Sequence, residues 1–255
     1  MRLAGAFLRA ANALVSFVTA LCLCTAGLYS VYALWDNSRV YSAAEDVQAD
    51  MIKLKPVVIE AGGASFEELL AVNRDVCAGI TRDNTNIDYP VLQGKTNLTY
   101  INTDVYGKFA LAGSIFLDSR NDRGFGDTCS LLYGHHMANG NMFGDLDKFE
   151  EESFFRKNKT GTLLLPDKTY DLEIYACLLV PASEDMIFDP QQHQDDINPL
   201  LDFVEQEALY YDADTVAALR QTNGESQILA LSTCSSEFTD ARTIILTVME
   251  PHVSE

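Results

Sequence analysis

The sequence of 255 residues carries a formal net charge of −19, and that charge is distributed unevenly. All 37 acidic residues, and all of the 18 basic ones except Arg2 and Arg9, follow position 35. This acidic portion argues against nucleic acid and anionic lipid as partners, because both require a basic protein surface. At roughly 220 residues it has the length of a single domain with one core of ordinary size.

Residues 10–35 contain no charged side chain and are rich in Leu, Val, Ala and Phe. About 20 apolar residues suffice for a helix to cross the hydrocarbon core of a bilayer. The stretch ends in aromatic rings of the kind that favours the membrane–water interface, namely Tyr29, Tyr32 and Trp35. It therefore predicts a transmembrane signal anchor over residues 10–35. The alternative is a cleaved signal peptide, whose apolar region is usually shorter, at about 7–15 residues.

The flanks of this stretch indicate its orientation. Arg2 and Arg9 precede it, and basic residues beside a span favour the cytoplasmic side. We therefore expect residues 1–9 in the cytoplasm, a single pass through the cell membrane, and the remaining chain on the extracellular side. Residues 36–60 are predicted to form a linker or helical stalk, and residues 61–255 a folded domain.

The first element predicted in that domain is a short helix. Ser65 and Glu68 have the spacing of a capping box, in which the serine hydroxyl and the glutamate carboxylate bond to main-chain N–H groups at a helix start. The helix is expected to run through Val72. Short runs rich in β-branched and aromatic residues follow at 87–92, 114–117, 130–133, 162–165, 170–180, 226–231 and 243–249. Several short strands separated by turn residues indicate a closed sheet or a sandwich.

A helical insertion interrupts the predicted strands. Asn198 is a suitable N-cap and Pro199 suits the first helical position. One face of this helix is predicted to carry apolar side chains at helical spacing, namely Leu200, Leu201, Val204 and Leu209. Residues 214–219 are expected to continue it as a second helical turn.

The cysteines do not indicate a disulfide-rich protein. Four of the six lie beyond the membrane stretch, and two disulfides among them remain open, although a domain of this size does not need them. Cys129 and Cys177 lie in apolar runs where buried free thiols are common. There is no CxxC pair or other zinc-ligand spacing, so we expect no structural metal.

Cys234 ends the apolar run 228–234, and Arg242 follows eight residues later. A cysteine with a cation nearby and a histidine available is a candidate for an activated thiolate nucleophile. The alternative is a cysteine that only packs in the core. His135 and His136 directly follow an apolar strand that ends in Gly134, a position where catalytic groups are often held. The alternative for either one is a histidine bonded to a loop carbonyl.

The two other histidines, His193 and His252, lie in polar segments. Both are expected to be solvated and without a catalytic role.

At these positions the sequence resembles the sortase family. Residues 133–137 (Tyr-Gly-His-His-Met) and 141–146 (Asn-Met-Phe-Gly-Asp-Leu) are similar to the sortase histidine loop. Residues 229–234 (Leu-Ala-Leu-Ser-Thr-Cys), with Arg242 behind them, resemble the sortase cysteine strand and its arginine. The three motifs occur in the expected order, which makes the resemblance more specific than any one of them alone.

Within the family the resemblance is to class B and covers roughly residues 60–250. Residues 84–91 (Asn-Thr-Asn-Ile-Asp-Tyr-Pro-Val) and 113–118 (Gly-Ser-Ile-Phe-Leu-Asp) are similar to segments of that class. So is the helical insertion before the cysteine strand. The resemblance implies a mainly β fold, a closed eight-stranded sortase-type β-barrel with N-terminal helices and that insertion.

The resemblance also implies a mechanism. Cys234 would be the nucleophile that attacks the Thr–Gly or equivalent bond of a C-terminal sorting signal of LPXTG or NPXTN type and forms a thioacyl intermediate. His135 would be the general acid and base, and Arg242 would bind the substrate carbonyl or the developing oxyanion. By position in the resemblance alone, the wall of the substrate groove would include Ser232, Asn97, Tyr100 and the loop around Ile187 and Phe188.

The partners implied by the resemblance are secreted proteins with a sorting signal and an amine acceptor. The amine would come from a peptidoglycan precursor or a pilin on a Gram-positive cell, and the class implies no cofactor and no metal. Two alternatives remain open: a membrane-anchored extracellular cysteine peptidase that hydrolyses without transfer, and a non-catalytic surface scaffold.

Overall fold

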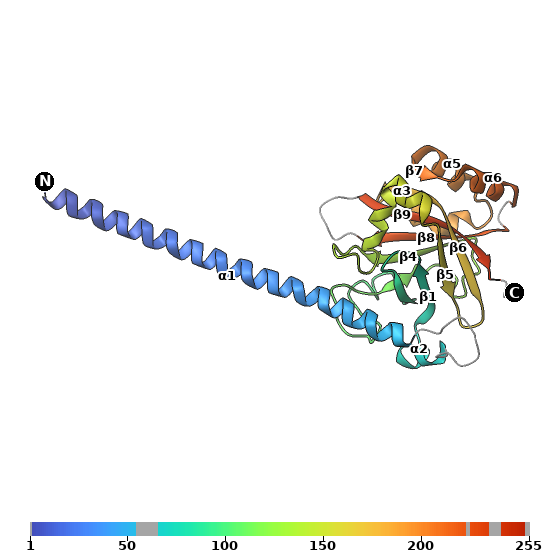
Figure 1. Ribbon diagram of the computed structural model, residues 1–255, viewed down its shortest axis with the longest axis horizontal. Helices are drawn as coiled ribbons and strands as arrows, with labels where there is room; N and C mark the ends of the chain where they lie inside the picture. Colours follow the sequence, from blue (N-terminus) through green and yellow to red (C-terminus); the bar gives the residue numbers. More distant parts are fainter. Residues whose placement is uncertain (1, 55–65, 223–224, 235–240, 253–255) are drawn as a thin grey trace. The chain divides into compact units, whose positions relative to one another are not determined.

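The computed structural model describes residues 2–54, 66–222, 225–234 and 241–252 (Figure 1). The chain divides into two compact units, Met1–Ser42 and Ala43–Glu255. The first unit is formed by part of helix α1 (Arg2–Leu54). Within α1 the stretch Gly5–Ala43 has a mean hydropathy of 1.9 and is long and apolar enough to cross a membrane. The structure is thus compatible with the predicted anchor.

Helices in the second unit are short. The predicted helix through Val72 is confirmed as α2, although Ser65 of the proposed capping box lies outside the described residues. The helices after α1 are α2 (Phe66–Val72), η1 (Gly144–Glu150), α3 (Glu152–Lys157), α4 (Asp185–Phe188), η2 (Pro190–His193), α5 (Asn198–Glu207) and α6 (Ala213–Thr222).

The second unit is built on one sheet that closes on itself. Its strands are β1 (Val76–Arg82), β2 (Asp88–Leu92), β3 (Ile115–Leu117), β4 (Cys129–His135), β5 (Thr160–Leu164), β6 (Thr169–Pro181), β7 (Ala208–Tyr211), β8 (Gln227–Cys234) and β9 (Ala241–Pro251). They are ordered β5-β1-β2-β3-β4-β8-β9-β6-β7, and β5 also pairs with β6. That last pairing closes eight strands into a barrel and leaves β7 as an extra strand on β6. The predicted closed eight-stranded barrel is confirmed.

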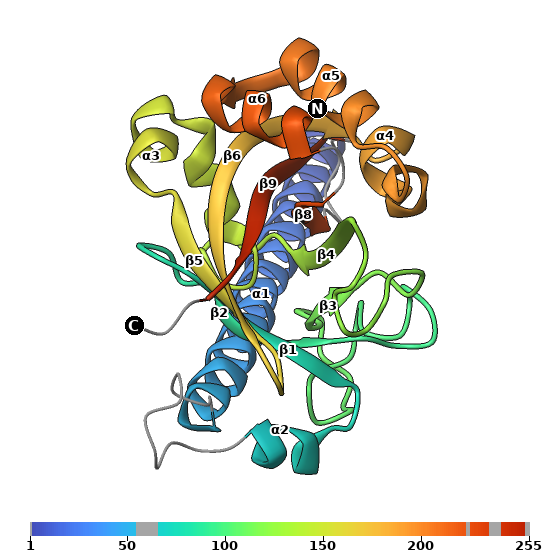
Figure 2. The same cartoon turned by 90° about the vertical axis from the view of Figure 1, so that its right-hand side faces the viewer.

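The helical insertion covers one side of the barrel. Figure 2 shows α5 and α6 packed beside β6 and β9. Leu200, Leu201 and Val204 of α5 are at most 1% exposed and belong to the same apolar cluster as the facing side chains of β6, β8 and β9. Full burial of such a side chain stabilises the fold by roughly 1.5–3 kcal/mol, so the apolar face of α5 fixes the insertion on the barrel.

The insertion departs from its predicted form at both ends. Helix α5 includes Asn198 and is preceded by Ile197 at the N-cap, while the Asn198 side chain bonds to Asp196. At the other end the helix stops at Glu207. Leu209, predicted on its apolar face, instead lies in strand β7 and is 44% exposed. The edge of β6 offers main-chain partners to residues 208–211, and this pairing outweighs one more helical turn.

Candidate active site

The ends of strands β4, β8 and β9 bring together three residues that are far apart in the sequence. Strands β4 and β8 pair in parallel, and the last pair of Cα partners is His135 and Cys234. On the other side of β8, Ser232 faces Ile244 of β9 in an antiparallel register. Continuing that register by two residues in each strand leads to Cys234 and Arg242. The three residues predicted to be catalytic therefore occupy one end of neighbouring strands.

The residue before His135 must be small. A Cβ atom on Gly134 would collide with the side chain of Ile115 on β3 and with the ring of Phe143. The loop after β4 folds back here, because the Phe143 N–H donates to the carbonyl oxygen of His135 at 2.9 Å. Gly134 thus lets β4 pass between β3 and this loop and sets the position of the histidine that follows.

His135 is half-buried, and its Nδ1 atom is buried without a hydrogen-bond partner among the described residues. Burial lowers the pKa of His135 below the ordinary value of 6.5. The ring is therefore mainly neutral at neutral pH, and it can receive a proton only at some cost in solvation. The second ring nitrogen, Nε2, is therefore the one available to exchange a proton with a substrate.

The neighbouring histidine is engaged differently. His136 Nε2 lies 2.6 Å from Asp147 Oδ2, and the residue forms an isolated bridge with Met142. A carboxylate therefore holds the ring of His136, whereas His135 has no such partner in the described part of the chain. This difference favours His135 as the histidine that works with the strand β8 cysteine.

A groove of about 350 Å³ lies beside these strand ends. Its lining comes from four parts of the chain, the loop before β3, strands β3 and β4, the start of the insertion, and strands β8 and β9. The lining residues are Asn97, Leu98, Ile101, Phe116, Tyr133, Ala182, Phe188, Thr233 and Arg242. Most of these side chains are apolar, which suits an extended peptide with apolar positions.

Three aromatic rings of the groove stack in a row. Tyr133 lies between Phe116 and Phe188, with ring centroids 5.2 Å and 6.3 Å away and interplanar angles of 29° and 10°. Phe188 belongs to the loop that the resemblance placed at the groove wall, and its place in the lining agrees with that expectation. Tyr133 was predicted only as part of the histidine motif, and Phe116 only as part of a class B segment. The alternating pattern of strand β4 could have identified Tyr133, because it places residue 133 on the same face of the strand as residue 135.

The predicted groove residues are only partly brought together. Asn97 and Arg242 line the groove. Ser232 is fully buried on β8, Tyr100 is 4% exposed and Ile187 is 3% exposed, so none of these three side chains presents a surface to it. Tyr100 instead donates from its hydroxyl to Asp75 Oδ2 at 2.8 Å. At the end of α4 it is Phe188, next to Ile187, that faces the groove.

His193 departs from its expected solvated state. Its side chain is 1% exposed, and Nε2 lies 2.8 Å from the carbonyl oxygen of Met186. Burial lowers its pKa, although the bond to Met186 acts in the opposite direction. The expectation was wrong because the neighbours of His193 in sequence are polar, whereas η2 places the His193 side chain inward, against the α4 turn.

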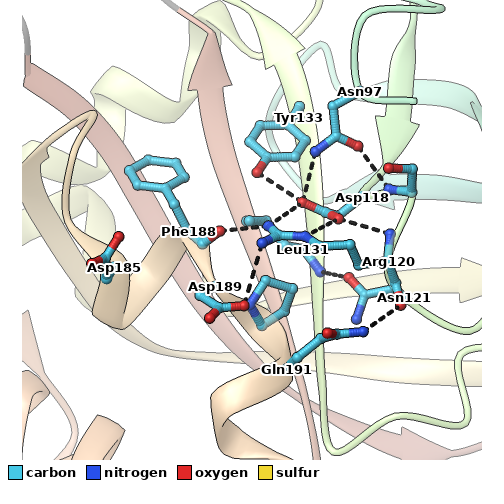
Figure 3. Close-up of polar contacts among 12 residues, drawn as sticks. Asn97, Asp118, Arg120, Asn121, Leu131, Tyr133, Asp185, Phe188, Asp189 and Gln191 are labelled. Atoms are coloured by element: carbon cyan, nitrogen blue, oxygen red, sulfur yellow. Dashed lines mark hydrogen bonds and ion pairs between the residues drawn. The ribbon is translucent and has the colours of Figure 1, made fainter.

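Behind the groove lies a fully buried carboxylate, Asp118, directly after strand β3 (Figure 3). Its oxygens accept five hydrogen bonds, three from Arg120, one from Asn97 and one from the Tyr133 hydroxyl. Burial alone would raise the pKa of Asp118, but these donors, Arg120 first among them, hold it below its ordinary value. Asp118 is therefore ionised at neutral pH, and its charge lies against the back of the groove.

Within the described residues, no cluster of three or more His, Cys, Asp or Glu side chains is arranged to hold a metal ion.

Comparison with known proteins identifies this arrangement. The family model for the sortase domain matches residues 80–250. The chain is 30% identical to sortase B of Listeria monocytogenes, over 80% of this chain and 81% of that protein. It is 28% identical to sortase B of Staphylococcus aureus, over 72% of each.

Solved structures agree with the sequence relatives. A class B sortase of Streptococcus pyogenes involved in pilus biogenesis is 39% identical, with a TM-score of 0.65 over 72% of this chain and 97% of that one. A sortase B–substrate complex of Staphylococcus aureus is 25% identical, with a TM-score of 0.66 over 85% of this chain and 97% of that one. The chain therefore belongs to the sortase family, as a class B sortase and hence a cysteine transpeptidase.

Proposed function

We propose that this transpeptidase uses Cys234 as its nucleophile, His135 as general acid and base, and Arg242 as the cation that stabilises the oxyanion. The observation that carries the proposal is the Cα pairing of His135 with Cys234 at the ends of β4 and β8, next to the groove that Arg242 lines. In this scheme the thiolate attacks the carbonyl carbon of the scissile bond and forms a thioacyl intermediate.

Proton transfers follow from the placement of His135. Its imidazolium donates a proton to the leaving amine when the first peptide bond breaks. The neutral ring then accepts a proton from the incoming amine as that amine attacks the thioester. Arg242 remains charged throughout and offers several N–H donors to the oxygen that becomes negative in both steps.

The substrates proposed are secreted proteins with a C-terminal sorting signal of LPXTG or NPXTN type. The acceptor is an amine of a peptidoglycan precursor or of a pilin. The apolar helix α1 supports a single-pass anchor that holds residues 61–255, as the catalytic domain, on the outer face of the cell membrane, where secreted proteins emerge. Residues 36–60 then form the linker or stalk.

A peptide-cleavage assay tests this proposal. The full-length protein in detergent is incubated with LPXTG- and NPXTN-type peptides, with and without an amine such as triglycine. We expect a ligated product and faster turnover when the amine is present, and an acyl adduct on Cys234 detectable by mass spectrometry. Cys234→Ala should form no adduct. Turnover by water alone, unaffected by the amine, would instead indicate a hydrolysing peptidase.

A further inference from the structure

Three groove residues depend on one ion pair outside the proposed catalytic group (Figure 3). Asp118 Oδ2 accepts from Asn97 Nδ2 at 2.8 Å and from the Tyr133 hydroxyl at 3.0 Å. On the other side, Arg120 Nη2 donates to the main-chain carbonyl of Phe188 at 2.6 Å. Asn97, Tyr133 and Phe188 all line the groove, whereas Asp118 and Arg120 do not.

The ion pair has a geometry that only arginine provides. Arg120 Nε donates to Asp118 Oδ1 at 2.9 Å and Nη2 donates to Oδ2 at 2.8 Å, so the planar guanidinium grips both carboxylate oxygens. From the same plane, Nη1 reaches Asp189 at 3.3 Å. A lysine ammonium is a point charge and cannot hold the carboxylate in two places while also reaching the Phe188 carbonyl.

Phe188 needs an external support because its helix is short. Helix α4 has a single turn, and an isolated turn is unstable in water. The buried side chain of Ile187 and the bond from His193 to the Met186 carbonyl fix the start of the turn. Arg120 fixes its end, and with it the Phe188 ring that stacks on Tyr133.

We propose that the Asp118–Arg120 ion pair is a positioning element that sets the shape of the peptide groove and thereby the affinity for substrate. It holds the Tyr133 hydroxyl and the Asn97 amide through Asp118, and it holds the Phe188 main chain through Arg120. Neither residue takes part in acyl transfer. This inference rests on the proposed function in taking the groove as the site of the sorting-signal peptide.

The kinetic test uses Arg120→Lys in the full-length protein, with a sorting-signal peptide and triglycine. A group that shapes the groove contributes to binding of the ground state and the transition state alike, so KM should rise about tenfold while kcat stays within about twofold. Arg156→Lys is the matched control, because Arg156 also grips a carboxylate, that of Glu152, but in an exposed pair on α3. That control should leave both constants unchanged. An unchanged KM in Arg120→Lys would overturn the proposal.

A double-mutant cycle shows whether Arg120 acts through the α4 turn. Phe188→Ala removes the ring whose position Arg120 fixes. If Arg120 acts through it, the rise in KM caused by Arg120→Lys should shrink to less than about half when Phe188 is already Ala. Fully additive effects on KM would contradict this coupling.

Hydrogen exchange tests the positioning without reference to activity. The amides of Ile187, Phe188 and Asp189 all donate within the α4 turn, at 2.9–3.0 Å. In Arg120→Lys these three amides should exchange at least about tenfold faster, while amides of β8 and β9 keep their rates. Unchanged exchange at 187–189 would overturn the proposal even if no peptide were turned over. By contrast, if the wild type turned over no more peptide than Cys234→Ala, that result would refute only the proposed function.

Discussion

The environment of His135 determines its protonation state in the free enzyme. Burial of the ring lowers its pKa, and the buried Nδ1 has no partner among the described side chains to favour the imidazolium. An ordinary thiol ionises near pH 8.5. In the proposed thiolate–imidazolium pair, burial of His135 opposes the charge on its ring, so we expect this pair to be a minor form of the free enzyme.

The pH dependence of kcat/KM follows from this. The active pair shares one proton, so below the lower pKa both groups are protonated and above the higher pKa neither is. We expect a bell-shaped profile with its acidic limb below pH 6.5, measured with a sorting-signal peptide between pH 5 and pH 10. His136→Gln should keep the shape of the profile, since Asp147 already holds that ring. A profile that only rises with pH would contradict an acid role for His135.

The same shift affects stability. Because the pKa of His135 is lower in the folded state than in the unfolded chain, the unfolded state binds the proton first as the pH falls. This residue therefore costs stability progressively below about pH 6.5, and no such loss comes from it at higher pH.

Sequence reasoning identified single groove residues less well than it identified motifs. Asn97 and Arg242 reach the groove, but Tyr100, Ile187 and Ser232 point into the core. Neighbours on a strand or a turn face opposite sides, so an error of one position exchanges a groove residue for a buried one. The Asp118–Arg120 pair could not have been predicted, because its partners Asn97, Tyr133 and Phe188 lie in segments that only the closed barrel brings together.

Strand β4 is tightly packed at the residue before His135. A methyl group added at Gly134 would collide with two side chains, that of Ile115 on β3 and that of Phe143 in the loop after β4. The strand can therefore approach its neighbours closely only because this residue has no side chain.

A pair of glycine substitutions tests this crowding. Gly134→Ala should destabilise the fold by about 1–3 kcal/mol, because the methyl group overpacks a filled site. It should also reduce kcat/KM by displacing His135. Gly79→Ala on β1 is the matched control, since an added Cβ meets nothing within 4 Å there. Urea denaturation of the full-length variants measures the free energy of unfolding, and the peptide assay measures kcat/KM. Equal stability of the two variants would show that β4 can relax around the methyl group.

For strands β1 and β7, the local sequence pattern was not enough to predict the secondary structure. Strand β1 was not among the predicted strands, because Cys77, Ala78 and Gly79 have weak strand preference. Pairing with both β2 and β5 nevertheless makes it an interior strand of the barrel. Leu209 of strand β7 was assigned to the preceding helix, but residues 208–211 instead pair with the free edge of β6. In both cases a non-local partner overrode the local preference.

At the scale of the whole molecule, an apolar helix precedes a strongly acidic domain. The stretch Gly5–Ala43 is apolar enough to span a bilayer, whereas all 37 acidic residues follow position 35. The domain has little attraction for anionic lipid. Membrane attachment should therefore depend on the helix alone.

Charges placed in the helix test this. Leu21→Arg combined with Leu23→Arg should raise the free energy of insertion by about 6–8 kcal/mol and move the protein from the membrane pellet to the supernatant after carbonate extraction. Leu179→Arg with Leu209→Arg adds the same charge at partly exposed positions of the domain and should leave the protein in the pellet. Retention of the first variant in the pellet would show that another part of the chain also anchors it.

The parallel pairing of β4 with β8 has a consequence for how the enzyme matures. Unlike a hairpin, two parallel strands need a long crossover between them, and here residues 136–226 supply it. Contacts so distant in sequence form slowly, because closing a large loop costs entropy before the strands pair. His135 meets the strand of Cys234 only after β5, β6 and the insertion have been synthesised. A partly emerged chain therefore cannot acylate itself or its neighbours, and the proposed activity begins with completion of the barrel.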